Sequence, residues 1–83
     1  MKYLLPGGES PERVNLLLML TKIRSSEVRQ AVTVYLVDGL PAVRAAARHG
    51  VALQNFHRAV DRLNEIAAIV EQIKELDFKS SVK

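Results

Sequence analysis

The feature that most restricts the fold of this chain is a regular run of apolar residues in its last third. The run advances in steps of three or four residues and comprises Phe56, Ala59, Leu63, Ile66, Val70 and Ile73. Because an α-helix has about 3.6 residues per turn, this spacing places the whole run along one side of a helix, in the manner of a heptad seam. We therefore predict a long helix from about Leu53 to Leu76, followed by a frayed tail over residues 77–83.

Proline and glycine divide the rest of the chain into shorter helical segments. Ser10-Pro11 indicates a helix start, since serine is a good N-terminal cap and proline is tolerated at the first helical position. Gly39 and Gly50 each follow a helical pattern and are typical of a residue just past a helix end. The predicted helices run from about Pro11 to Ile23, from about Glu27 to Asp38, and from Ala42 to His49.

The second of these helices has a competing interpretation, because β-branched residues are frequent in it and a strand over Val32–Val37 is possible. We favour the helix because its apolar positions keep helical spacing over three turns. With residues 1–9 as a lead-in segment, the expected fold is all-α. It is a compact bundle of about four helices, which forms a single domain over residues 1–83.

Composition excludes several classes of protein. The chain has no cysteine, so it is no disulfide scaffold and has no thiolate metal site, and its two histidines are too few for a metal centre. Its longest hydrophobic string, Leu16 to Leu20, is far shorter than the roughly 20 residues of a membrane span. The apolar stretch at the N-terminus is too short for a signal peptide. We expect a cytoplasmic protein with no metal, no cofactor and no membrane partner.

The net charge of +3 is small but concentrated. Residues 39–64 hold one acid, Asp61, against four arginines: Arg44, Arg48, Arg58 and Arg62. In the rest of the chain basic and acidic residues are equal in number, so their charges cancel. Such a concentration is typical of a nucleic-acid-binding surface, although a solvated face with chance clustering would look the same.

The same window has the pattern of a helix-turn-helix. Ala46 supplies the small residue at which a second helix can cross closely, and Gly50, four residues later, can take the positive φ of the turn. Apolar residues follow where the second helix would face inward, at Val51, Phe56, Ala59 and Leu63. A plain αα-hairpin with a glycine turn is the alternative.

In a helix-turn-helix, the outward face of the second helix meets the major groove of double-stranded DNA. The outward residues here are Leu53, Gln54, Asn55, His57, Arg58, Asp61 and Arg62. Gln54 and Asn55 lie in the first turn and can pair with adenine, while Arg58 can pair with guanine.

The remaining arginines, Arg44, Arg48 and Arg62, are better suited to phosphate contacts. We interpret His57 as a neutral polar contact or a surface residue. It has no neighbouring serine or carboxylate partner that would make a catalytic triad, so no enzyme activity and no small-molecule ligand are predicted.

Several short motifs, in this order and spacing, resemble the PapB-like family of adhesin (fimbrial) operon regulators over about residues 3–76. They are Leu4-Leu5-Pro6-Gly7, Leu17-Leu18, Ser26 with Val28, Tyr35-Leu36-Val37 with Gly39, Phe56, and Arg62-Leu63. The resemblance implies a compact helical protein that binds promoter DNA as a dimer or higher oligomer and controls transcription of a fimbrial operon. The chain departs from the family pattern at Ala42 and Ala46, where relatives commonly have arginine and cysteine. It also departs at Ala52 and Leu53, where relatives have polar residues.

Assembly is also suggested by surplus apolar surface. The first helix carries more apolar residues than one core needs, and the second half of the last helix would expose isoleucines unless something covers them. We expect a homodimer that uses both surfaces, with a single monomeric core as the alternative. The competing function is a non-enzymatic helical module for protein–protein interaction.

Overall fold

The structure, a computed structural model, describes residues 3–81 of the chain and contains four helices there. They are α1 (Pro11–Met19), α2 (Ser26–Leu36), α3 (Ala42–Arg48) and α4 (Leu53–Ser81). No strand occurs between residues 3 and 81, and residues 32–36 are helical. The all-α prediction, with a long C-terminal helix, is therefore confirmed.

Serine side chains begin the first two helices, as the sequence predicts for α1. The Ser10 Oγ accepts a hydrogen bond from the Arg13 N–H at 3.1 Å, and Pro11 occupies the first helical position. At α2 the Ser25 Oγ accepts from the Val28 N–H at 3.3 Å. Each serine satisfies a backbone donor that the helix itself leaves free, which stabilises the helix by about 1 kcal/mol.

The first helix ends at Met19, four residues before the predicted end at Ile23. The N–H groups of Leu20 and Thr21 donate to the carbonyls of Leu17 and Leu18, both at 3.1 Å, which closes the last turn tightly. The Thr21 hydroxyl also donates to the Leu18 carbonyl at 2.7 Å. Residues 20–25 consequently form a non-helical connection, hereafter the α1–α2 linker.

The other helix ends also differ from the prediction. α2 ends at Leu36 rather than Asp38, and α3 ends at Arg48, one residue early. α4 continues beyond the predicted end at Leu76 and runs to Ser81, so residues 77–81 are helical rather than a frayed tail. Residues 82–83, the end of that predicted tail, lie outside the described residues.

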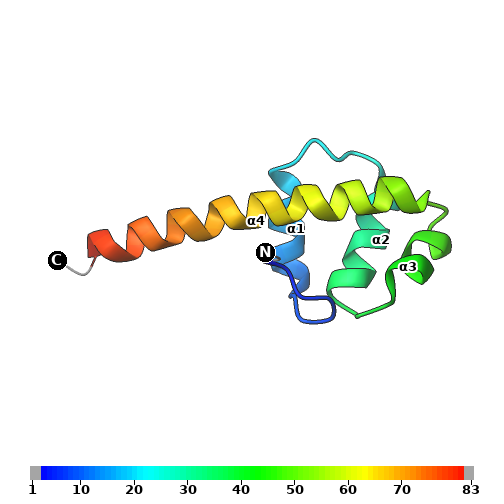
Figure 1. Ribbon diagram of the computed structural model, residues 1–83, viewed down its shortest axis with the longest axis horizontal. Coiled ribbons are helices and arrows are strands. Elements are labelled where there is room, and N and C mark those ends of the chain that lie inside the picture. The colour runs from blue at the N-terminus through cyan, green and yellow to red at the C-terminus, as the bar shows by residue number, and fades with distance from the viewer. Residues whose placement is uncertain (1–2, 82–83) are drawn as a thin grey trace.

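The long helix α4 organises the molecule (Figure 1). The other helices pack along its first half, whereas its second half projects away from them. At 1.5 Å per residue its 29 residues extend over about 43 Å, which is most of the 50 Å long axis. The core lies between this first half and the three shorter helices, and its largest fully buried side chains include Leu36, Phe56 and Leu63.

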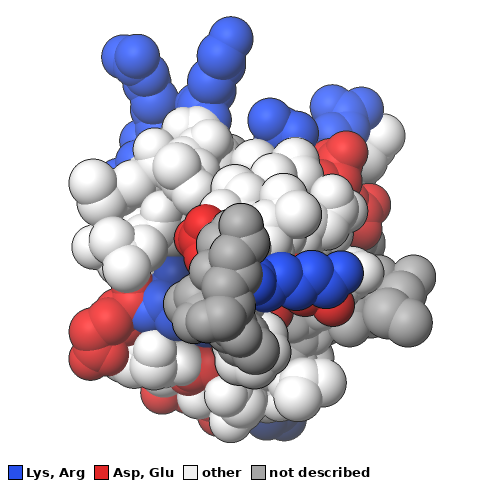
Figure 2. Space-filling model, turned by 90° about the vertical axis from the view of Figure 1, so that its left-hand side faces the viewer, with Lys and Arg blue, Asp and Glu red and all other residues white. Residues whose placement is uncertain are grey.

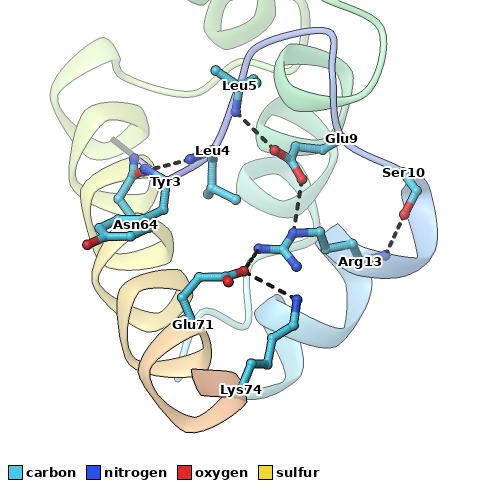
Figure 3. Close-up of polar contacts among 9 residues, drawn as sticks. All are labelled: Tyr3, Leu4, Leu5, Glu9, Ser10, Arg13, Asn64, Glu71 and Lys74. Carbon is cyan, nitrogen blue, oxygen red and sulfur yellow. Dashed lines mark hydrogen bonds and ion pairs between the residues drawn. The ribbon is translucent and has the colours of Figure 1, made fainter. Parts of the chain in front are cut away.

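The N-terminal segment is tied to α4 and α1 (Figure 3). The Asn64 Oδ1 accepts hydrogen bonds from the N–H groups of Tyr3, at 2.9 Å, and Leu4, at 3.2 Å, and the Leu4 side chain is buried. Arg13 of α1 pairs with Glu9 at 3.0 Å and with Glu71 of α4 at 3.3 Å. Residues 3–9 are thus part of the fold, although they form no helix.

Two glycines hold this segment against the end of α2. Gly7 and Gly39 both have positive φ, +75° and +78°, and their backbones touch. A Cβ on Gly7 would lie 3.2 Å from the Gly39 Cα, which is closer than ordinary van der Waals contact, so the backbone would have to shift to admit a side chain. Beside this contact the Glu9 N–H donates to the Leu36 carbonyl at 3.1 Å and so satisfies one of the last carbonyls of α2.

Candidate nucleic-acid interface

The turn between α3 and α4 depends on one glycine. Gly50 has a φ of +66°, and its N–H donates to the Ala47 carbonyl at 3.2 Å. The following N–H, of Val51, donates to the Ala46 carbonyl at 2.8 Å. These two bonds form a Schellman motif, in which a left-handed residue ends a helix and reverses the chain. The prediction that Gly50 takes a positive φ is confirmed.

The residues predicted to face inward on either side of this turn do so. Ala46 is buried, and on α4 Phe56, Ala59 and Leu63 are buried, with Val51 partly buried against the same core. The Phe56 ring meets the Tyr35 ring of α2 edge to face at a centroid distance of 5.2 Å. The packing leaves the opposite side of α4 in contact with solvent.

All the residues that the sequence analysis proposes for DNA contact are exposed on these two helices. They are Arg44 and Arg48 on α3 and Gln54, Asn55, His57, Arg58 and Arg62 on α4. Arg44 and Arg48 are four residues apart and share one face of α3.

Helical spacing separates the α4 positions into groups. Asn55, Arg58 and Arg62 follow in steps of three and four and form one stripe, hereafter the basic stripe. Gln54 lies beside this stripe on the helix surface, and the residue two turns further on in its own row is the acidic Asp61. His57 lies further around the helix.

The basic stripe keeps its charge available for a ligand. Arg62 lies 3.8 Å from Glu65, and more than half of each side chain is exposed, so this pair contributes little. Between residues 3 and 81 no acidic side chain pairs with Arg58. By contrast, Arg13 is held in its two ion pairs and Arg29 donates to the Ile23 carbonyl at 2.9 Å, so both serve the fold.

A comparison with protein families decides what kind of protein carries this surface. A family model described as adhesin biosynthesis transcription regulatory protein, PapB, matches residues 1–76. The chain belongs to the PapB family. The resemblance predicted from short motifs is thereby confirmed, and the family is one of transcription regulators. No curated protein and no solved structure was found to match the chain.

In this PapB-family chain the match covers α1, α2 and α3 in full and most of α4, up to Leu76. Over the described residues no group of three or more histidine or acidic side chains could hold a metal ion. No helix within residues 3–81 is both long and apolar enough to cross a membrane.

Basic residues outside the predicted window also contribute to the surface of this PapB-family chain. Figure 2 shows Lys and Arg side chains projecting along the upper edge of the molecule. In Figure 1 the α1–α2 linker, drawn in cyan, rises to this same edge above the first half of α4. The linker contains two exposed basic residues, Lys22 and Arg24. Neither residue was among those proposed from the sequence, where Lys22 fell inside the predicted first helix and both lay outside the arginine-rich window of residues 39–64.

Proposed function

We propose that this chain regulates transcription of a fimbrial (adhesin) operon by binding promoter DNA with α3 and α4. The observation that carries the proposal is the basic stripe on the exposed side of a helix that follows a tight glycine turn. A helix in this position after a short turn is the recognition helix of helix-turn-helix proteins. Membership of a family of transcription regulators supports the same conclusion. The protein would act in the cytoplasm, where promoter DNA is accessible, and would need no cofactor.

The exposed side chains suit different parts of the DNA. Asn55, with Gln54 beside it, lies in the first turn of α4, where an amide can reach an adenine edge. Arg58, one turn further on, can bind guanine or a phosphate. For Arg62, Arg44 and Arg48 we propose phosphate contacts, which position the protein without selecting a sequence, and for His57 a polar contact at the margin.

We further propose that the chain acts as a homodimer, since a single recognition helix reads few base pairs. The candidate interface is an apolar line on the projecting half of α4, formed by Ile69, Ile73 and Leu76 and hereafter called the distal stripe. Each of its side chains is at least half exposed. A lone helix that exposes such a line to water is unfavourable, and pairing with a second copy would cover it.

The distal stripe adjoins an apolar groove on the rest of the molecule. The groove is lined by Arg13, Leu16 and Leu17 of α1, by Leu20 just past the end of α1, and by Val70, which lies three residues before Ile73 on α4. Leu16 and Leu20 are large apolar side chains, yet both are exposed. A second copy that pairs along the distal stripe would meet this groove as well, so one contact would cover both apolar surfaces.

A DNA-binding titration tests the proposed function. The protein would be titrated, by fluorescence anisotropy, onto a labelled duplex from a fimbrial-operon promoter and onto a shuffled duplex of equal composition. We expect tighter binding to the promoter and a steep loss of affinity with salt on both duplexes. Absence of binding to either duplex at low salt would contradict the proposal.

The second candidate function is a helical module that binds another protein, and the exposed distal stripe favours it. Such a module would also pair through apolar surface, but its self-association or partner binding would not depend on the arginines of α4. Failure of DNA binding together with intact dimerisation would support this alternative.

A further inference from the structure

We propose that the α1–α2 linker is a second DNA-contacting element, in which Lys22 and Arg24 bind phosphates beside the basic stripe of α4. This inference rests on the proposed DNA-binding function and extends it. It assigns a role to two residues that lie outside the two-helix unit and outside the arginine-rich window of residues 39–64.

The linker presents its basic residues through a regular alternation. Lys22 and Arg24 are exposed, whereas Ile23 between them is partly buried and packs against the core. With Ile23 anchored against the core and both of its neighbours exposed, the two charges stay in contact with solvent.

Hydrogen bonds at both ends and in the middle hold the linker in place. The Thr21 hydroxyl donates to the Leu18 carbonyl at 2.7 Å, and its oxygen accepts from the Ile23 N–H at 3.2 Å. The Arg29 side chain of α2 donates through Nε to the Ile23 carbonyl at 2.9 Å. At the far end Ser25 caps α2. A segment held this firmly loses little conformational entropy when it binds a ligand.

The linker lies close to the first half of α4. The two helices that it joins, α1 and α2, both pack on α4. Figure 1 places the linker at the upper edge of the molecule, above the first half of α4, and Figure 2 shows Lys and Arg side chains gathered along that upper edge. A duplex lying against the basic stripe would therefore have a neighbouring backbone within reach of this edge.

The chemistry of the two side chains suits phosphate rather than bases. Lysine provides a flexible point charge and arginine a fork of donors, and both neutralise phosphates, which releases counterions. Between residues 3 and 81 neither residue forms an ion pair with an acidic side chain. The linker would thus add affinity for any DNA sequence and leave the choice of sequence to α4.

The test compares two double variants of equal charge. Lys22→Ala with Arg24→Ala removes the linker charges, while Lys74→Ala with Lys79→Ala removes two charges from the second half of α4. Affinity for promoter and shuffled duplexes would be measured over a range of salt concentrations, with circular dichroism to verify the fold.

We expect the linker variant to bind both duplexes roughly tenfold more weakly at low salt, by the same factor on each, whereas the control variant binds nearly as the wild type does. The slope of log affinity against log salt should fall by about 2, because two phosphates are no longer neutralised by the protein. A linker variant that matches the control overturns the inference. A loss confined to the promoter duplex overturns the assignment to phosphate. Lack of DNA binding by the wild type would instead refute the proposed function itself.

Discussion

At the scale of the residue, three glycines with positive φ show how differently the same substitution should act. Gly50 is free of neighbours, with nothing within 4 Å of the position of an added Cβ, so only its backbone conformation requires glycine. Gly7 and Gly39 combine the same conformation with direct backbone contact. A side chain at the α3–α4 turn should therefore destabilise the fold only through backbone strain. In the N-terminal loop it should destabilise the fold through backbone strain and through a close contact as well.

We expect Gly50→Ala to lower the free energy of unfolding by about 1–2 kcal/mol, since alanine is strained in the left-handed region. Gly50→Asn should lower it less, because asparagine tolerates this region. Gly7→Ala should be the most destabilising, since it adds the 3.2 Å contact with the Gly39 Cα. Chemical denaturation would measure all three variants. Equal stability of Gly50→Ala and the wild type would show that the turn does not require a left-handed residue.

At the scale of the element, the start of α2 contributes to the stability of the fold in a way that depends on pH. The pKa of Glu27 is lowered from its ordinary value, chiefly by a hydrogen bond from its own backbone N–H and then by the Ser25 hydroxyl, which donates to the carboxylate at 3.1 Å. Because the folded state holds this proton less tightly than the unfolded state does, Glu27 stabilises the fold above its ordinary pKa. The stabilisation is lost as pH falls through the lowered value.

Glu27→Gln should accordingly be less stable than the wild type at neutral pH, and the two should converge in acid. Thermal unfolding between pH 7 and pH 3 would follow the difference. Glu75→Gln, in the last third of α4, provides a control that removes a charge away from any helix start. A difference in stability between the wild type and Glu27→Gln that stays constant from pH 7 to pH 3 would contradict the account.

Helix identity was predictable from the sequence because apolar spacing and capping residues act locally. The Gly50 turn and the inward residues of α4 follow from the same patterns. The end of α1 was not predictable in this way, since neither glycine nor proline marks it and the Thr21 hydroxyl closes it. That error placed Lys22 inside a helix and concealed the exposed linker. The anchoring of Leu4 by Asn64 was also missed, because it joins residues 60 positions apart.

At the scale of the whole molecule, the projecting half of α4 determines the expected assembly. The basic stripe in the first half of α4 and the distal stripe in its second half lie along one side of the helix in steps of three and four residues, joined through the acidic residue Glu65. One side of a single helix would thus combine the surface proposed for DNA with the surface proposed for a second copy.

We expect Ile73→Lys to convert the dimer into a monomer without unfolding it, because the Ile73 side chain is already half exposed within one chain. A buried lysine at the proposed interface would be unpaired and strongly unfavourable. Gln72→Lys, one residue away on the exposed surface, is the matched control and should remain dimeric. Sedimentation equilibrium at micromolar concentration distinguishes them. A wild-type monomer at every concentration, free and on DNA, would refute the dimer.

The central claim is that the basic stripe of α4 is the surface that meets DNA. Its most direct test is the promoter affinity of Arg58→Ala with Arg62→Ala, measured beside the equally charged control Lys74→Ala with Lys79→Ala. Both arginines are exposed, so circular dichroism should remain that of the wild type. We predict a clear loss of affinity for the arginine variant alone, with a lower salt slope and, through Arg58, a loss of selectivity of about 1–3 kcal/mol. Equal affinities of the two variants, with the fold intact, would contradict the claim.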